Sequence, residues 1–162
     1  LNEVESLTLE YPRIHVFGCD AAFAAAGFNI RAEGAYTLMQ DRDYVDYISY
    51  TAGFDRAIPL NNLNINFQIL GTYYLGEHEN GCANLAAVQV SDSWYYDKIR
   101  PKITTAYGFE NGDGMAEAVL EWDIVQDFTM SLKYRLFYGD EVSRFGQFDD
   151  NDYAELQFRF SF

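Results

Sequence analysis

Strict alternation of apolar and polar residues is the feature that most constrains how this 162-residue chain can fold. The stretch 28–38 shows it clearly, with one apolar or small side chain at every second position: Phe28, Ile30, Ala32, Gly34, Tyr36 and Leu38. Successive side chains of a β-strand point to opposite faces, so a period of two predicts a strand with one apolar and one polar face. The same pattern predicts strands at 48–55, 63–69, 99–107, 116–124, 130–138 and 154–162.

Two further segments, 13–24 and 83–91, alternate less regularly and are weaker strand candidates. With them the chain has about nine strands of roughly 10 residues. Pro101 predicts a weakened strand or a bulge at 99–107, because proline has no N–H for the ladder. The expected fold class is all-β and antiparallel, in one region covering residues 1–162.

Two architectures accommodate such strands. In a soluble sandwich or a lipocalin-like barrel the apolar face turns inward, whereas in a transmembrane β-barrel it turns outward to lipid. Strands of about 10 residues suit a tilted crossing of the hydrocarbon layer, while globular strands have about five or six. The aromatic content of 17% also favours strands and membrane interfaces. These observations favour the transmembrane barrel, and the lack of a long apolar run excludes a helical membrane protein.

The charged residues on the predicted polar faces balance. The basic ones are Arg31, Arg100, Lys102, Lys133, Arg135 and Arg159, and the acidic ones are Glu33, Asp55, Glu117, Glu121, Asp123 and Glu155. The net charge of -14 must therefore lie in the connections. All of these residues except Asp55 are the candidate lining of a pore.

The sign of the charge also alternates from strand to strand after residue 99. If 125–127 make a turn, Glu117 faces Arg135, and Glu121 lies diagonal to Lys133, close enough to pair. Such pairing would lower the cost of burying charge in a partly dehydrated lumen. A solvated surface with chance alternation is the alternative, and there the pairs would contribute little.

The final ten residues, YAELQFRFSF, form an aromatic stripe. After Tyr153 every second residue is apolar: Ala154, Leu156, Phe158, Phe160 and Phe162. Tyr153, Leu156, Phe158, Phe160 and Phe162 resemble the C-terminal insertion signal of Gram-negative outer-membrane barrels, which the barrel assembly machinery reads. YPRIHVFGCD, YISYTAGFDRAI, LNINFQILGTYY and LKYRLFYGDEVSRFGQFDDND, which precedes the stripe, resemble the C-terminal portion of a family of outer-membrane porins of unassigned function, related in style to alginate-export barrels.

This resemblance implies a pore in the bacterial outer membrane. The partners it implies are membrane lipid and lipopolysaccharide, the barrel assembly machinery and small hydrophilic solutes, and it allows a homo-oligomer. Barrels of that family are much longer, and single-chain bacterial barrels have even strand counts. Nine strands therefore indicate a fragment that lacks earlier strands. Without a strand at 83–91, the chain would instead be a complete barrel of eight strands with a long connection at 77–93.

The residues that could carry chemistry do not form a recognisable constellation. No nucleophile with its base, no phosphate-binding loop and no Cys/His metal spacing is present, so neither an enzyme nor a cofactor is expected. The 11 basic residues are scattered, which argues against a nucleic-acid partner. Cys19 and Cys82 are expected to be unpaired, buried thiols, with one disulfide as the alternative.

Acidic residues cluster in two connections. They are Glu77, Glu79, Asp140, Glu141, Asp149, Asp150 and Asp152. Their spacing does not match a calcium loop, so a solvated rim is the expectation.

Three functions remain open at this point. The first is a diffusion pore, the second is a small closed barrel with a structural or adhesion role, and the third is a soluble β-barrel that binds an apolar ligand.

Overall fold

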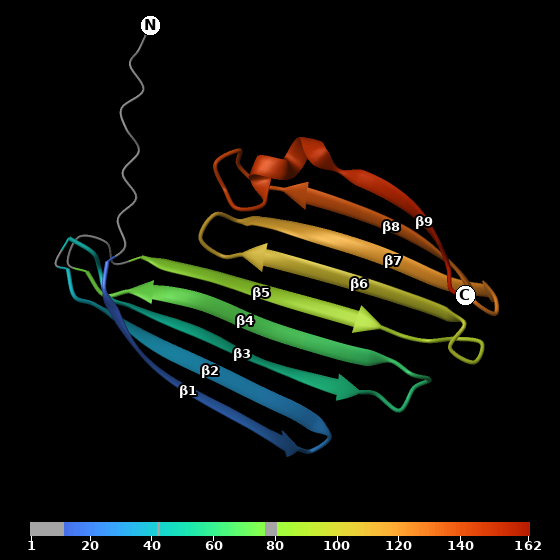
Figure 1. Cartoon of the computed structure of the whole chain (residues 1–162), viewed down its shortest axis with the longest axis horizontal. Coiled ribbons are helices and arrows are strands. Elements are labelled where there is room, and N and C mark those ends of the chain that lie inside the picture. Colours follow the sequence, from blue (N-terminus) through green and yellow to red (C-terminus); the bar gives the residue numbers. More distant parts are fainter. Residues whose placement is uncertain (1–11, 42, 77–80) are drawn as a thin grey trace, which may run out of the picture.

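The computed structural model describes residues 12–41, 43–76 and 81–162. They form one antiparallel sheet of nine strands, in which each strand pairs with its neighbours in sequence (Figure 1). The strands are β1 (Ile14–Ala25), β2 (Phe28–Met39), β3 (Tyr47–Ala57), β4 (Asn64–Tyr74), β5 (Cys82–Ser91), β6 (Ile99–Gly108), β7 (Asp113–Val125), β8 (Phe128–Tyr138) and β9 (Tyr153–Phe160). A 3-10 helix, η1 (Gly146–Asn151), precedes β9. The all-β, antiparallel prediction is therefore confirmed.

Both weakly predicted strands are present. β1 covers the irregular segment at 13–24, and β5 covers the segment at 83–91. The alternative of eight strands with a long connection at 77–93 is therefore wrong. Because β5 exists, the turns after β1, β3, β5 and β7 lie at one end of the sheet, and the connections after β2, β4, β6 and β8 lie at the other. We call these the turn end and the loop end.

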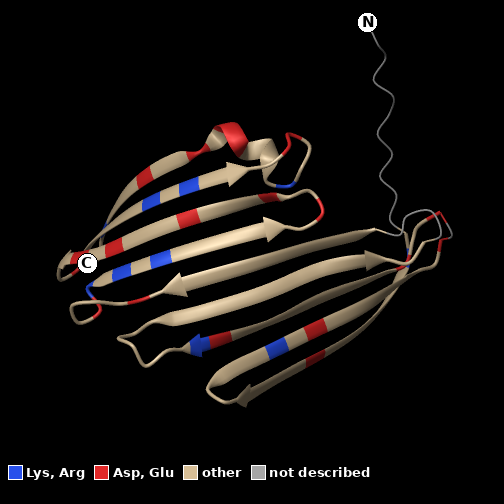
Figure 2. Cartoon of the chain, turned by 180° about the vertical axis from the view of Figure 1, so that it is seen from behind, with Lys and Arg blue, Asp and Glu red and all other residues tan. Residues whose placement is uncertain are grey.

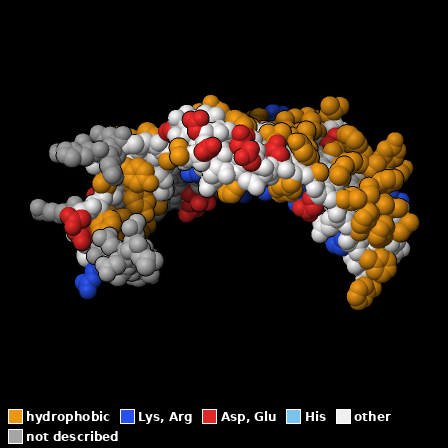
Figure 3. All heavy atoms as spheres, turned by 90° about the horizontal axis from the view of Figure 1, so that it is seen from above, with side chains coloured by type: hydrophobic (Ala, Val, Ile, Leu, Met, Phe, Trp, Pro, Cys, Tyr) orange, Lys and Arg blue, Asp and Glu red, His pale blue; other side chains and the backbone are white. Residues whose placement is uncertain are grey.

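The sheet is open, because β1 and β9 are edge strands that do not pair with each other. Seen from above, the molecule is bent into an arch, with hydrophobic side chains gathered over the outer side of its right-hand limb (Figure 3). A single layer has no second layer to bury its apolar face, and among the described hydrophobic residues only Leu85 and Ala106 are buried. No helix in the described part of the chain has the length and apolar character needed to span a membrane.

β6 is continuous and has no bulge at Pro101, so the predicted bulge is absent. On one side Pro101 pairs with Leu120 of β7, and on the other side the β5 ladder already ends at the pair Ser91–Lys102. The Pro101 carbonyl still accepts the Asp92 N–H at 3.1 Å. The missing N–H of proline thus falls at the end of a ladder, where it breaks no pairing.

The connection between β5 and β6 has an unusual backbone. Tyr95, Tyr96 and Asp97 are consecutive residues in the left-handed region, with φ of 54°, 61° and 65°. Non-glycine residues adopt this region at a cost, so the surrounding contacts must hold it. The Asn61 amide donates to the Asp92 carboxylate at 2.8 Å, and the Asn62 amide donates to the Ser93 hydroxyl at 2.8 Å. The turns after β3 and β5 are therefore joined.

Candidate functional site

The register gives the sheet two chemically different faces. Residues paired directly across antiparallel strands share a face. Following the pairs from strand to strand places all the predicted charged residues on one side, the polar face. They are Arg31, Glu33, Asp55, Arg100, Lys102, Glu117, Glu121, Asp123, Lys133, Arg135, Glu155 and Arg159. The structure thus brings the predicted set together on one surface.

Opposite charges pair across β7, β8 and β9. Basic bands on β6 and β8 flank the acidic band on β7 (Figure 2). The Arg135 Nε donates to the Glu117 carboxylate at 2.9 Å, which confirms the predicted pair. The predicted pairing of Glu121 with Lys133 is wrong, because Lys133 binds Glu155 at 2.9 Å instead. Glu155 lies directly opposite Lys133 in the register, whereas Glu121 is one diagonal step away.

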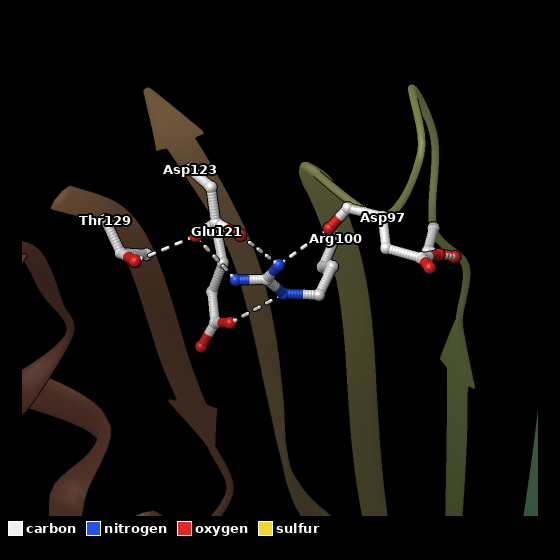
Figure 4. A network of polar contacts seen from close by, with 6 residues as sticks. Asp97, Arg100, Glu121, Asp123 and Thr129 are labelled. Atoms are coloured by element: carbon white, nitrogen blue, oxygen red, sulfur yellow. Dashed lines mark hydrogen bonds and ion pairs between the residues drawn. The ribbon is translucent and has the colours of Figure 1, made fainter. Parts of the chain in front are cut away.

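Arg100 is the centre of the densest polar cluster on this face (Figure 4). Its two terminal nitrogens donate to the two Asp123 oxygens at 2.6 and 3.0 Å, and its Nε donates to Glu121 at 3.2 Å. It also donates to the Asp97 carbonyl at 2.6 Å, and the Thr129 hydroxyl donates to Asp123 at 2.8 Å. Such a bidentate pair has a fixed geometry. The cluster therefore joins β6, β7, β8 and the turn after β5.

The rest of the polar face carries fewer charges. Arg31 binds Asp55 at 2.8 Å near the turn end of β2 and β3. Within the described ranges, Glu33, Lys102 and Arg159 have no ion-pair partner. The polar face of β4 and β5 is uncharged, and its polar side chains are Asn64, Asn66, Gln68, Thr72, Tyr74, Gln89 and Ser91. Along the polar face, the ion pairs of β6 to β9 are therefore followed by the uncharged strands β4 and β5. Beyond these strands lie the fewer charges of β2 and β3.

The apolar face is exposed along its whole width. Among strand residues in the described ranges, Arg56 is the one Lys, Arg, Asp or Glu on this face, and its guanidinium lies 4.4 Å from the centre of the Phe28 ring. Phe17, Leu132 and Phe158 retain 63%, 48% and 57% of their accessible surface.

Aromatic side chains are sorted along the apolar face. Those toward the turn end are Phe23, Phe28, Phe54, Phe67, Trp122, Phe128, Phe158 and Phe160. Those toward the loop end are mostly tyrosines: Tyr36, Tyr50, Tyr73, Tyr107 and Tyr138. The middle is largely aliphatic, for example at Ala52, Ile69, Ala118 and Leu132.

The two cysteines also lie on the apolar face. They are unpaired, as expected, but exposed, so the prediction of buried thiols is wrong. Cys19 pairs with Gly34, and Cys82 pairs with Tyr73, which places both on a face that no second layer covers.

Three further charged residues lie on the polar side although the sequence did not predict them there. Asp20 lies in β1, where it pairs directly with Glu33, and Asp113 begins β7 on the polar face. Arg144 lies in the connection 139–152 between β8 and β9. Asp20 does continue the alternation of Gly18 and Ala22, which is the one signal that could have found it. Asp113 sits in the turn-like sequence NGDG, and Arg144 carries no local signal.

Arg144 lines a hollow on the polar face together with residues far from it in sequence. The hollow has a volume of about 720 Å³, and its polar lining includes Asp20, Glu33, Ser49, Thr51, Thr72 and Arg144. Strands β1 to β4 therefore form one wall and the connection 139–152 contributes to another.

The described acidic residues of the two acidic connections lie at the surface. Asp140, Glu141, Asp149, Asp150 and Asp152 are all exposed, while Glu77 and Glu79 lie outside the described residues. No three His, Cys, Asp or Glu side chains in the described ranges come together in a way that could hold a metal ion.

Comparisons of the chain with protein-family profiles, with curated proteins and with solved structures found no match. The class of the protein therefore follows from its fold and from the two faces of its sheet. The protein is an all-β chain with an open antiparallel sheet, apolar on one face and charged on the other.

Proposed function

We propose that the sheet is part of the wall of a porin-like β-barrel in the bacterial outer membrane. Its apolar face contacts lipid, and its polar face lines a water-filled path for small hydrophilic solutes or ions. One observation carries the proposal: nine adjacent strands expose an apolar face that bears Arg56 as its single charge in the described strands. Soluble monomers rarely expose contiguous apolar patches larger than a few hundred Å².

The dimensions and the aromatic residues support the same function. The strands have 8 to 13 residues, a range that includes the roughly 9 to 11 residues needed for a tilted crossing of the hydrocarbon layer. Transmembrane barrels carry aromatic girdles at both interfaces around an aliphatic band. Phe and Trp near the turn end and Tyr near the loop end match that pattern.

The edges of the sheet fit a larger barrel. In a membrane every backbone N–H and C=O must be paired, so a barrel wall has no free edge. β1 and β9 each have one unpaired edge. In the complete barrel we expect both to pair with further strands.

The remaining partners follow from the exposed groups. Leu156, Phe158 and Phe160 of β9 form the stripe that we expect the barrel assembly machinery to recognise. Exposed carboxylates such as Asp41 and Asp43, in the connection between β2 and β3, lie at the loop end, where divalent cations could bridge them to lipopolysaccharide.

The two native cysteines provide a test of which face meets lipid. A fluorophore on Cys19, in the Cys82→Ala protein, should be quenched by brominated lipid and little by iodide. The matched control carries the fluorophore on the polar face, in Cys19→Ala/Cys82→Ala/Ser49→Cys, and should show the reverse. Quenching of the Cys19 label by iodide alone would contradict the proposal and favour a soluble protein.

Conduction is tested separately, with the full-length protein in planar bilayers. We expect stepwise, salt-dependent current. Lipid-quenched Cys19 without any current would leave a structural barrel, because insertion and conduction are independent measurements.

A further inference from the structure

The connection between β8 and β9 folds over the polar face instead of extending away from the sheet. We propose that residues 139–152 form a rigid constriction segment, and that Arg144 on this segment determines the ion selectivity of the path opposite Asp20 and Glu33. This inference rests on the proposed pore. We call residues 139–152 the constriction segment.

Its position follows from contacts with the polar face. The Phe145 N–H donates to the Asp113 carboxylate at 2.7 Å, and Asp113 retains only 2% of its accessible surface. The ring of Phe148 lies 5.5 Å from that of Phe137, which is also a polar-face residue because it pairs with Met115. One buried carboxylate and one aromatic contact therefore hold the segment on the inner side of the arch.

The segment is also held internally. The Ser143 hydroxyl donates to the Asp140 carbonyl at 2.7 Å and accepts the Gly146 N–H at 3.0 Å. Ser143 and Gly146 are buried. A Cβ on Gly146 would lie 2.6 Å from the Gly139 carbonyl oxygen, so even alanine would not fit without a shift of the backbone. These contacts fix the backbone of the segment, and therefore the point on the polar face from which the Arg144 side chain extends.

Charges around the hollow are arranged asymmetrically. Asp20 and Glu33 lie directly opposite each other on β1 and β2, and neither has an ion-pair partner among the described residues. The two carboxylates repel each other because they lie directly opposite in the ladder. Their combined negative charge attracts cations. Arg144 lines the same hollow from the constriction segment and forms no ion pair within the described ranges, although its charge also attracts the Glu110 carboxylate. The path thus runs between a negative wall and one positive side chain.

Arg144 should therefore limit the preference for cations that Asp20 and Glu33 create. Replacing it with an acid leaves carboxylates on both sides of the hollow. Since local charge sets the field that a passing ion meets, selectivity should move toward cations while the path stays open. Salt should weaken the effect, because charges are screened over about 10 Å at 0.1 M.

Reversal potentials of the full-length protein in a KCl gradient test the inference. We expect Arg144→Glu to raise the K⁺/Cl⁻ permeability ratio several-fold and Arg144→Lys to keep the native ratio. The matched control is Arg13→Glu, which makes the same change of charge at the loop end, outside the hollow. It should change the ratio little.

Each result decides the matter. An inserted native protein that carries no current would remove the proposed pore and this inference together. Native current with equal ratios in Arg144→Glu and Arg13→Glu would overturn the inference alone. If Arg144→Glu does not insert, Arg144→Gln takes its place, and an unchanged ratio in that variant is equally decisive.

Discussion

Single residues on the polar face are held by neighbours that the register puts directly opposite them. Lys133 forms an ion pair with Glu155, and Arg135 forms one with Glu117, because residues directly opposite in the register are closer than diagonal ones. Exposed ion pairs contribute only about 0.2–1 kcal/mol each, so these contacts orient side chains more than they stabilise the sheet. The identity of the face is therefore the stronger determinant of what a substitution does.

Adjacent residues on β8 give a matched pair of substitutions. Leu132→Arg places a charge on the apolar face between Leu120 and Leu156, whereas Ser131→Arg places it on the polar face beside Glu121. A charge facing lipid near the midplane costs about 2–4 kcal/mol. We expect Leu132→Arg to reduce the amount of folded, heat-modifiable protein in outer-membrane fractions, and Ser131→Arg to leave it near native. Intolerance at Ser131 with tolerance at Leu132 would reverse the assignment of the faces.

Asp46 predicts how the loop end responds to acid. The Met39 N–H and then the Tyr36 hydroxyl donate to its carboxylate, at 2.8 and 2.7 Å, and hold the pKa of Asp46 below its ordinary value of 3.8. A lowered pKa in the folded state means that these contacts stabilise the connection above that ordinary value and are lost as the pH falls through the folded pKa. Amide exchange at Met39, corrected for its intrinsic rate, should therefore accelerate below about pH 4.

The Asp46→Asn protein is the control for this experiment. Asparagine does not titrate in this range, so the acceleration at Met39 should be absent. The same acid response in both proteins would show that another group controls the loop end.

At the level of elements, the turns after β3 and β5 are hydrogen-bonded to each other at the turn end, and the connection 139–152 packs on the polar face. The turn after β5 keeps three left-handed residues because Asn61 and Asn62, in the turn after β3, bind Asp92 and Ser93. These contacts also lower the pKa of Asp92: burial alone would raise it, but the Trp94 indole N–H, the Ser93 N–H and Asn61 donate to the carboxylate and outweigh that effect. Strain in the backbone is thus balanced by side-chain hydrogen bonds.

Tyr96 tests whether that strain is real. Its side chain is 100% exposed and its φ is 61°, so glycine would lose no side-chain contact and would remove the steric cost of the left-handed region. We expect Tyr96→Gly to raise the free energy of unfolding by up to about 1 kcal/mol. Asn62→Ala should lower it by about 1 kcal/mol, since its amide donates to Ser93 and Asp97. Urea unfolding in detergent measures both, and a destabilised Tyr96→Gly would contradict the argument.

At the scale of the whole molecule, one curved layer presents an apolar face on one side and a charged face on the other. The paired charges of β6 to β9 occupy one part of the polar face, and the hollow with Asp20, Glu33 and Arg144 occupies another. A solute on the proposed path would therefore meet a balanced wall on one side and an unbalanced one on the other.

The balanced wall can be unbalanced without changing its size much. Lys133→Glu with Arg135→Glu turns two ion pairs into four carboxylates and should increase permeability to K⁺ over Cl⁻. Control variants exchange partners instead, as Lys133→Glu/Glu155→Lys and Glu117→Arg/Arg135→Glu, and should keep the native ratio. Reversal potentials in a salt gradient are the measurement. An unchanged ratio in the folded acidic variant would show that β8 does not line the conducting path.

Several features of this protein are local enough to be predicted from sequence alone. Alternation at 28–38 and 130–138 predicts strands and assigns each residue to a face, because a strand's side-chain period is two whatever surrounds it. The short turn between β7 and β8 lets the register follow, which is why Glu117 was matched correctly with Arg135. Strand class and the composition of both faces are consequences of neighbours along the chain, whereas the choice between eight and nine strands depended on β5, whose alternation is weak.

Other features depend on residues that meet only after folding. Glu121 turns away from Lys133 because Arg100 arrives from β6, and the cysteines are exposed because no second layer covers the apolar face. Asp113 and Arg144 gain their positions when the chain folds back after β8, a path that no local pattern encodes. Period and charge thus determined the two faces, while the curvature of the sheet and the return of one connection across it decided which charges meet, since those contacts join residues distant in sequence.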